Sequence, residues 1–265
     1  MEKVAYLGPV GSYSHLAAMK MCEGAEVEAY GSFFLAMGAL ERGECDWAVL
    51  PIENSLNGAV LQNIDLLQAG NAVAVEKLSL ALDHRLATLK GAEYSGICRI
   101  YSHEQSLAQC ADYLHENFPN VQLIATPSTA ASLDMVKTKA DAAIVGAHLK
   151  RDGIELSPRN IADSKHNFTD FLLVRRGEVD ENKKSERIFF SVTCRHKSGA
   201  LLDILQPMSR CGLNMTKIQS RPIKDRAGEY RFFIEVEGDY SSEIMRRSLE
   251  TVKNSSLSFK LLGTY

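Results

Sequence analysis

The stretch RRGEVDENKKSER, residues 175–187, divides the chain into two parts that differ in the order of their predicted elements. It is dense in charge, contains a glycine and has no apolar periodicity, which is typical of a linker or of a strand end followed by a linker. We therefore expect one domain over residues 1–180 and a second over residues 187–265.

Before the linker, short apolar runs alternate with stretches of helical pattern. The predicted strands are residues 3–7, 46–52, 98–101, 121–125 and 142–145. The predicted helices are residues 13–22, 33–42, 56–67, 105–117 and 130–137. This alternation is typical of an α/β domain with largely parallel sheets.

After the linker, the order of the predicted elements changes. Strands are expected over residues 188–194, 215–221, 231–237 and 257–262. Helices are expected over residues 200–210 and 243–252, and Gly212 is well placed to end the first of them. The order βαββαβ is the ferredoxin-like plan.

The bulk composition argues against several classes of protein. A net charge of -3 over 265 residues disfavours an extended nucleic-acid surface. The 6 cysteines form no C-x-x-C pair, so zinc-ribbon and thioredoxin motifs are absent. The start MEKVAYLG leads straight into a strand-like run, and no apolar run reaches membrane-spanning length. We therefore expect a cytoplasmic protein that binds neither nucleic acid nor membrane.

Small polar residues gather at the predicted strand-to-helix junctions. These junctions are GPVGSYS (8–14), PIENS (51–55), SHEQ (102–105) and TPST (126–129). Helix N-termini favour anions, and ligands of open α/β sheets bind at the carboxyl ends of strands, so converging junctions would form a site for a small anion. Each junction taken singly also fits an ordinary helix cap. No Walker loop or complete G-x-G-x-x-G supports nucleotide binding.

Read together, these stretches resemble the prephenate dehydratase family with a C-terminal ACT regulatory domain. The resemblance covers nearly the whole chain in the right order. It is carried by GPVGSYSH (8–15), PIENSLNGAV (51–60), YSHEQSLAQC (101–110), NIADSKHNFTDF (160–171), SGALLDIL (198–205) and KIQSRP (217–222).

The resemblance implies a fold and an activity. It implies a two-lobed catalytic domain like a periplasmic binding protein, followed by a ferredoxin-like ACT domain. One lobe would hold residues 1 to about 80 with a return segment near 160–178, and the other would hold about 80–160. The implied reaction is the decarboxylating dehydration of prephenate to phenylpyruvate in L-phenylalanine biosynthesis, without metal or other cofactor. Feedback by L-phenylalanine and a homodimer or homotetramer are implied as well.

The resemblance also assigns site residues. The catalytic positions would be Thr169, Glu53, Asn54, Ser102 and Gln109, and the substrate-binding positions Gly11, Ser12, Ser55, Asn167, Phe171 and Asp170. Thr169 would donate a hydrogen bond to the leaving hydroxyl, while Asn54 and Ser102 would hold carboxylates. Glu53 is either a rival acid or a carboxylate favoured by a helix N-terminus. Ser102 and Gln109 are spaced by two helical turns, which would place both on one helix face.

One position departs from the family pattern. The family segment Thr-Arg-Phe is Thr169-Asp170-Phe171 here, so the local charge changes by two units. A carboxylate about 5 Å from a dianionic substrate would cost roughly 3 kcal/mol at an effective dielectric constant of ~20. Three interpretations remain: a cation such as Lys165, Arg175 or Arg176 compensates, the protein is a weakened or inactive relative, or the substrate is arogenate, whose ammonium pairs with Asp170.

The second part of the chain carries the implied effector site. Its residues would be Gly199, Ala200, Leu201, Asn214, Gln219, Ser220, Arg221 and Pro222. Gln219 stands where the family motif begins with glutamate, which removes a charge but keeps a hydrogen-bonding side chain. The alternatives are that this part only dimerises the protein, or that the whole chain is a non-catalytic sensor of an aromatic amino acid.

Overall fold

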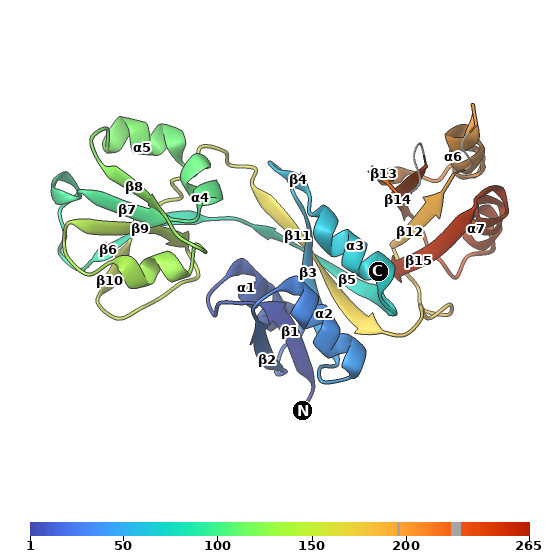
Figure 1. Cartoon of the computed structure of the whole chain (residues 1–265), viewed down its shortest axis with the longest axis horizontal. Helices are drawn as coiled ribbons and strands as arrows, with labels where there is room; N and C mark the ends of the chain where they lie inside the picture. The colour runs from blue at the N-terminus through green and yellow to red at the C-terminus, as the bar shows by residue number, and fades with distance from the viewer. Residues whose placement is uncertain (195–196, 224–228) are drawn as a thin grey trace.

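The computed structural model describes residues 1–194, 197–223 and 229–265. Figure 1 shows three bodies in a row: lobe 1 in the middle, lobe 2 on the left and a C-terminal module on the right. One sheet of 10 strands runs through lobe 1 and the module, and a sheet of 5 strands forms lobe 2. The predicted α/β, two-lobed architecture followed by a ferredoxin-like unit is confirmed.

Lobe 1 contains most of the N-terminal elements and one returning strand. Its strands are β1 (Lys3–Leu7), β2 (Glu26–Tyr30), β3 (Trp47–Asn54), β4 (Gly58–Ala59), β5 (Ala72–Ala81) and β11 (Phe168–Arg176), and its helices are α1 (Tyr13–Met21), α2 (Phe33–Arg42) and α3 (Leu61–Ala69). Strand β1 runs parallel to β2 and β3, but β11 is antiparallel to both β3 and β5. The expectation of largely parallel pairing fails there because the chain leaves lobe 1 along β5 and returns along β11.

Lobe 2 is built on a mixed sheet in the order β10-β6-β9-β7-β8. Its elements are β6 (His84–Leu89), η1 (Tyr94–Gly96), β7 (Arg99–Ser102), α4 (Glu104–Ala108), α5 (Ala111–Asn117), β8 (Gln122–Ala125), η2 (Ala131–Met135), β9 (Asp141–Gly146) and β10 (Ile154–Leu156). The helix predicted over 105–117 is interrupted at Gln109 and Cys110, and the one predicted over 130–137 is a short 3-10 turn.

The C-terminal module has the predicted βαββαβ order. Its elements are β12 (Arg187–Thr193), α6 (Ala200–Arg210), β13 (Met215–Pro222), β14 (Tyr230–Glu237), α7 (Glu243–Ser255) and β15 (Ser258–Thr264). The strands lie in the order β13-β14-β12-β15, and both helices bury an apolar face against them, including Ile204 and Met208 from α6. The arrangement is ferredoxin-like.

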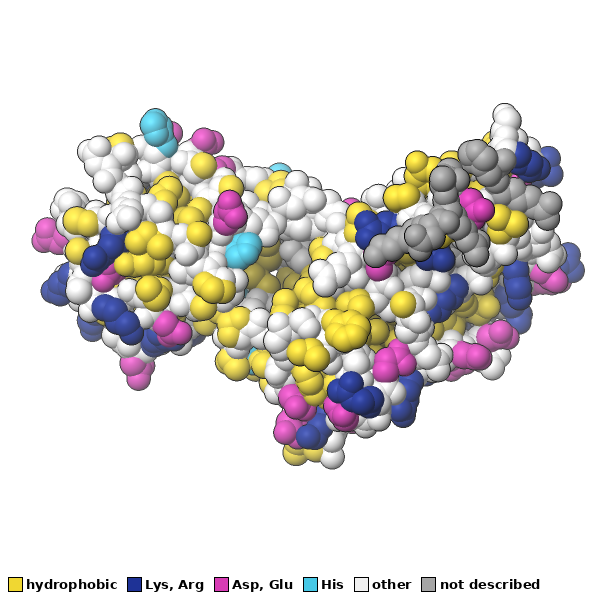
Figure 2. Space-filling model, in the orientation of Figure 1, with side chains coloured by type: hydrophobic (Ala, Val, Ile, Leu, Met, Phe, Trp, Pro, Cys, Tyr) yellow, Lys and Arg dark blue, Asp and Glu magenta, His cyan; other side chains and the backbone are white. Residues whose placement is uncertain are grey.

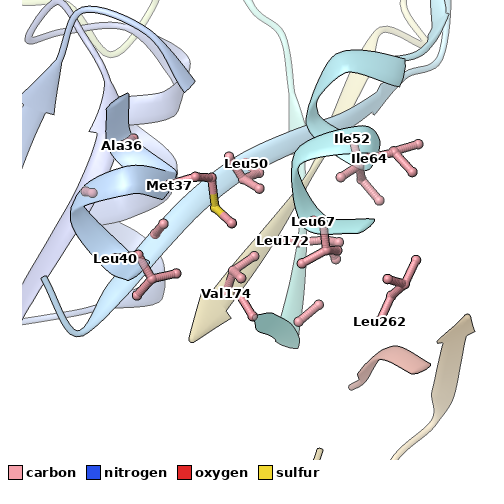
Figure 3. Packing of buried hydrophobic residues seen from close by; sticks show 14 of the residues in the cluster. Ala36, Met37, Leu40, Leu50, Ile52, Ile64, Leu67, Leu172, Val174 and Leu262 are labelled. Atoms are coloured by element: carbon pink, nitrogen blue, oxygen red, sulfur yellow. The ribbon is translucent and has the colours of Figure 1, made fainter. Parts of the chain in front are cut away.

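The module is joined to lobe 1 by main-chain pairing and by side chains. Gly263 of β15 pairs in parallel with Ala74 of β5, and a Cβ on Gly263 would lie 2.5 Å from the Ala74 carbonyl oxygen. Figure 3 shows Leu262 of the module facing the same core as Ile64 and Leu67 of α3. Lys260 donates to the carbonyl oxygens at the C-terminal end of α3, those of Leu67, Gln68 and Gly70, at 3.1, 2.7 and 2.6 Å.

Two segments of chain connect the lobes. Residues 82–83 lead from β5 into β6, and residues 157–167 lead from lobe 2 back to β11. They are held to each other, since the Leu82 amide donates to the Asn167 carbonyl at 2.8 Å and the His84 amide to Asn160 Oδ1 at 3.0 Å. The residues at this double crossing therefore fix how the two lobes face each other.

Candidate active site

A cavity of about 290 Å³ lies between the two lobes at the carboxyl ends of β1, β8 and β9. Figure 2 shows the surface hollowed between the left-hand lobe and the centre. Three of the four predicted junctions line it, and the lining residues are Leu7, Gly8, Gly11, Ser12, Tyr13, Ser14, His103, Gln105, Pro127, Ser128, Thr129, Ala130, Gly146, His148 and Leu149. None of these lining residues is Lys, Arg, Asp or Glu, so polar contacts to a ligand would come from main chain, hydroxyls and imidazoles.

The loop before α1 is held against lobe 2 across this cavity. His148 Nε2 lies 2.9 Å from the Gly11 carbonyl oxygen, and the Tyr13 hydroxyl donates to the Asp83 carbonyl at 3.1 Å. The Tyr13 ring meets the His148 ring edge-on, with centroids 4.9 Å apart. Burial lowers the pKa of His148, so its imidazole is neutral at physiological pH and contributes no fixed positive charge.

Asn54 and Thr169 face each other where β3 and β11 pair at the inner end of lobe 1. Asn54 Nδ2 lies 3.1 Å from Thr169 Oγ1, and 3.0 Å from both the Phe168 carbonyl and Asn167 Oδ1. The three polar side chains of this group, those of Asn54, Asn167 and Thr169, are buried. Because an amide nitrogen is a donor only, the Thr169 oxygen accepts from Asn54, and its own hydrogen stays available for a ligand.

Gln109 connects lobe 2 to this group. Its Oε1 accepts from Asn167 Nδ2 at 2.9 Å and lies 3.0 Å from His84 Nε2. The structure therefore brings together Asn54, Gln109, Asn167 and Thr169, which come from three separate stretches of the sequence and were predicted as site residues. None of the four is among the residues that line the cavity. His84 was not predicted, because a lone histidine without ligand spacing carries no signal that marks it.

Ser102 does not lie where the sequence placed it. It ends β7 in the core of lobe 2, fully buried, and its hydroxyl donates to the Ile144 carbonyl at 2.8 Å. Ser102 and Gln109 share no helix face, because Ser102 is a strand residue and Gln109 terminates α4. The N-cap of α4 is His103, whose Nδ1 accepts from the Gln105 amide, and Ser102 therefore caps no helix.

Glu53 and Asp170 lie on the opposite face of the sheet from Asn54 and Thr169. They pair with each other in register, and side chains alternate faces along a strand. Glu53 Oε2 lies 2.5 Å from Lys217 Nζ of β13, and Asp170 Oδ2 lies 2.9 Å from Lys77 Nζ of β5. The predicted repulsion between Asp170 and a substrate carboxylate therefore does not arise in this structure, and Glu53 faces the module.

Phe171 also differs from its predicted place. It is 2 % exposed and packs in the core of lobe 1 with Val4, Tyr6 and Leu173. An aromatic ring in this position stabilises the sheet and has no access to the cavity. The β-bulge between Asp170 and Phe171 is the local irregularity that separates the site end of β11 from its core end.

Six charged side chains form a cluster between lobe 1 and the module. This inter-module charge cluster contains Glu53, Lys77, Asp170, Arg187, Lys217 and Glu235. Its three cations balance its three carboxylates. Burial alone would raise the pKa of Glu235, but hydrogen bonds from Thr216 and Tyr265 and the charges of Lys77 and Lys217 lower it to about 2. The carboxylate is therefore a fixed negative charge at the junction.

The remaining predicted residues have clear places. Ser12 caps α1 and, like Gly11, lines the cavity. Ser55 lies just beyond Asn54 and donates to the His166 carbonyl at 2.9 Å. Of the effector residues, Gly199, Ala200 and Leu201 begin α6, while Asn214, Gln219, Ser220, Arg221 and Pro222 lie before or along β13. Arg221 pairs with Asp65 of α3, which makes it a contact between module and lobe 1.

Two further findings concern metals and membranes. Within residues 1–194, 197–223 and 229–265, no three His, Cys, Asp or Glu side chains are grouped so as to hold a metal ion. Over the same residues, none of the helices combines the length and the apolar character needed to span a bilayer.

The fold and the site together define a class: a two-lobed α/β protein with a small-ligand cavity between its lobes and a ferredoxin-like module behind them. The sequence model of the family described as "Prephenate dehydratase" matches residues 4–179. The chain belongs to the prephenate dehydratase family, whose members are lyases.

Curated relatives extend over the whole chain. A prephenate dehydratase of Lactococcus lactis is 32% identical over 272 residues, covering 99% of this chain and 97% of the relative. A bifunctional chorismate mutase/prephenate dehydratase of Neisseria gonorrhoeae is 32% identical over 267 residues, covering 99% of this chain and 74% of the relative. The similarity therefore includes the C-terminal module.

Solved structures share the same fold over nearly the whole of this chain. A prephenate dehydratase from Arthrobacter aurescens in complex with L-Phe has a TM-score of 0.89 and 28% identity, covering 99% of this chain and 89% of that one. A protein described as GqqA, a novel type of quorum quenching acylase, has a TM-score of 0.89 and 25% identity, covering 100% and 97%.

Proposed function

We propose that this protein catalyses the decarboxylating dehydration of prephenate to phenylpyruvate, in the cytoplasm, as a step of L-phenylalanine biosynthesis. The observation that carries the proposal is the hydrogen-bonded group of Asn54, Thr169, Asn167 and Gln109 at the junction of the lobes, in a chain of the prephenate dehydratase family. This group is built from neutral donors and acceptors, which suits a reaction that needs polarisation at one leaving oxygen.

The reaction can be followed bond by bond. The bond between the ring and its carboxylate breaks, carbon dioxide leaves, and the electron pair moves through the ring to expel the hydroxyl on the opposite carbon. Aromatisation of the ring drives the step. Thr169 donates a hydrogen bond to the departing oxygen, and Asn54 orients Thr169 by donating to its Oγ1. The threonine hydroxyl is too weak an acid to release its proton alone, so it polarises the oxygen or relays a proton.

The neutral lining of the cavity also favours the loss of carbon dioxide. A lysine or arginine paired with the departing carboxylate would stabilise the substrate more than the transition state, in which that charge is dispersed into the ring. The lining residues contain no such cation. Main-chain amides and hydroxyls are sufficient to hold the second carboxylate.

The two other interpretations of Asp170 lose their support. Both assumed a carboxylate beside the substrate, whereas Asp170 faces Lys77 and the module. Arogenate would require an acid to pair with its ammonium group, and no acid is among the residues that line the cavity. Prephenate therefore remains the substrate that this site suits best.

We expect purified protein to convert prephenate to phenylpyruvate and to act at least 100-fold more slowly on arogenate. The measurement follows phenylpyruvate absorbance in alkali for prephenate and phenylalanine by chromatography for arogenate. A folded protein that forms no phenylpyruvate from prephenate would contradict the proposed function. Faster turnover of arogenate would instead assign that substrate.

For the C-terminal module, we propose an ACT regulatory domain over residues 187–265, following the catalytic domain of residues 1–180. Two copies of the module would bind L-phenylalanine between them through the predicted effector residues, in a homodimer or homotetramer. Its ferredoxin-like strand order and the L-Phe complex of the Arthrobacter relative support this assignment.

L-phenylalanine is expected to raise the melting temperature and to lower turnover of prephenate. A ligand tenfold above its dissociation constant adds about 1.4 kcal/mol, or roughly 2–4 °C for a chain of this size. Differential scanning fluorimetry with L-phenylalanine, D-phenylalanine and L-alanine provides the measurement and its stereochemical control. No shift with millimolar L-phenylalanine, or an equal shift with D-phenylalanine, would contradict an effector site.

A further inference from the structure

The direction of every hydrogen bond in the amide group can be deduced from two main-chain anchors. Asn54 Oδ1 lies 3.2 Å from the Leu56 amide and 3.0 Å from the Asn57 amide, and main-chain N–H groups are always donors. Asn54 Nδ2 lies 3.0 Å from the Phe168 carbonyl, which is always an acceptor. The orientation of the Asn54 amide is therefore fixed at both ends.

This orientation passes along the group to lobe 2. Because Asn54 Nδ2 is a donor, Asn167 must present Oδ1 to it, at 3.0 Å. Asn167 then presents Nδ2 to Gln109, whose Oε1 accepts at 2.9 Å. The same Oε1 lies 3.0 Å from His84 Nε2, so that nitrogen must carry a hydrogen and donate it.

Within this group, two buried atoms have no hydrogen-bond partner among the described residues: Gln109 Nε2 and His84 Nδ1. A buried donor without a partner costs about 1–3 kcal/mol, so native structures rarely keep one without a use. The two N–H bonds of Gln109 Nε2 are therefore free for a ligand. Swapping the Gln109 oxygen and nitrogen would hide them against two donors, those of Asn167 and His84.

His84 is well held for this purpose. It is 1 % exposed, its main-chain amide donates to Asn160 Oδ1, and its main-chain carbonyl accepts from the Ile161 amide. The Tyr13 ring meets it edge-on, with centroids 6.3 Å apart. Burial also lowers the pKa of His84, which keeps the imidazole neutral at physiological pH.

We propose that His84 is a positioning residue that, in its Nε2–H tautomer, fixes the Gln109 amide so that Gln109 Nε2 is presented as a donor to an oxyanion of the substrate. The proposal rests on the proposed function, since the oxyanion belongs to prephenate or to its departing hydroxyl. His84 acts only through Gln109 and touches no substrate itself.

The first experiment does not depend on turnover. Nitrogen-15 NMR of the imidazoles in the full chain, with His84→Gln used to assign the signal, distinguishes a protonated Nε2 from a protonated Nδ1. At pH 7 we expect a neutral His84 with hydrogen on Nε2. A neutral ring with hydrogen on Nδ1, or a doubly protonated ring, would overturn the deduced orientation whatever the protein catalyses.

The second experiment is a double-mutant cycle on phenylpyruvate formation. We expect His84→Leu to lower kcat 10- to 30-fold, and His84→Gln, which keeps an N–H donor, to stay within about 3-fold of the parent. In a Gln109→Met background, His84→Leu should have almost no further effect, because the amide that it orients is gone. Melting temperatures identify any variant that is merely unfolded.

The outcomes of the cycle are distinct. An equal loss from His84→Leu with and without Gln109, or a loss in His84→Gln as large as in His84→Leu, would overturn the positioning role. If the parent chain forms no phenylpyruvate, the proposed function fails, while the NMR result still decides the orientation of Gln109.

Discussion

Thr169→Val is expected to lower kcat for phenylpyruvate formation by about 100- to 1,000-fold, the loss typical of one hydrogen-bond donor to a developing oxyanion. Valine has nearly the shape of threonine but no hydroxyl, so the departing oxygen loses its polarising donor. The fold should tolerate the change, since Asn54 Nδ2 retains the Phe168 carbonyl and Asn167 Oδ1 as acceptors. Stopped-time assays of phenylpyruvate at saturating prephenate measure the effect.

Thr169→Ser provides the matched control for this prediction. Serine keeps the hydroxyl and its contact with Asn54, so we expect activity within about tenfold of the parent. The role assigned to Thr169 would be refuted if the valine variant kept more than a tenth of the parental kcat. A valine variant with a raised KM and an unchanged kcat would instead indicate a binding role for Thr169.

Asp170→Arg is expected to destabilise the protein by about 2–4 kcal/mol without increasing turnover. The new guanidinium would lie beside Lys77, whose Nζ is now 2.9 Å from the Asp170 carboxylate. The inter-module charge cluster would change from balanced to an excess of two positive charges. Because Asp170 faces away from Thr169, no gain in prephenate binding is expected. Urea unfolding with tryptophan and far-UV signals measures the loss.

Asp170→Asn separates charge from shape in the same experiment. It removes the ion pair with Lys77 but adds no cation, so a smaller loss of about 1–2 kcal/mol is expected. In a Lys77→Met background, Asp170→Asn should cost less than it does in the parent, because its partner is already absent. An Asp170→Arg protein that is as stable as the parent and more active would show that Asp170 does act at the substrate site.

The sequence grouped Thr169 correctly with Asn167 but placed Asp170 wrongly. The motifs identified the segment of residues 160–171 as part of the site, and Asn167 and Thr169 are indeed hydrogen-bonded there. The error was to treat neighbouring residues as neighbours in space. Once residue 168 is recognised as the start of a strand, period-two alternation puts Thr169 and Asp170 on opposite faces.

Ser102 and Gln109 illustrate the opposite difficulty. Their spacing fits two turns of helix, but Ser102 is the last residue of strand β7 and Gln109 is the C-cap of helix α4. A local pattern cannot reveal this, because a short apolar run before a polar junction reads equally well as the end of a strand or the start of a helix. Strands β5 and β6 were also missed, because charged and polar residues such as Glu76, Lys77 and Arg85 interrupt their apolar pattern.

His84, Lys217 and Glu235 could not be found from sequence at all. Each acquires its role from a partner on another element: Gln109 for His84, Glu53 for Lys217, and Lys77 with Arg187 for Glu235. No spacing rule connects positions that meet only through tertiary packing. The ferredoxin-like module was predictable because each of its helices and strands has its own apolar pattern in the sequence, and the order of these elements follows directly along the chain.

Because Gly263 of β15 pairs with Ala74 of β5, the C-terminal module lies against the β5 edge of the lobe 1 strands. A chain ending after residue 180 would lose the pairing at Ala74 on the outer side of β5 and expose that sheet edge, and an open edge of this kind recruits other strands. It would also leave the α3 carbonyls without the Lys260 ammonium. We therefore expect removal of the C-terminal module to promote self-association of the remaining chain, whether or not the module binds an effector.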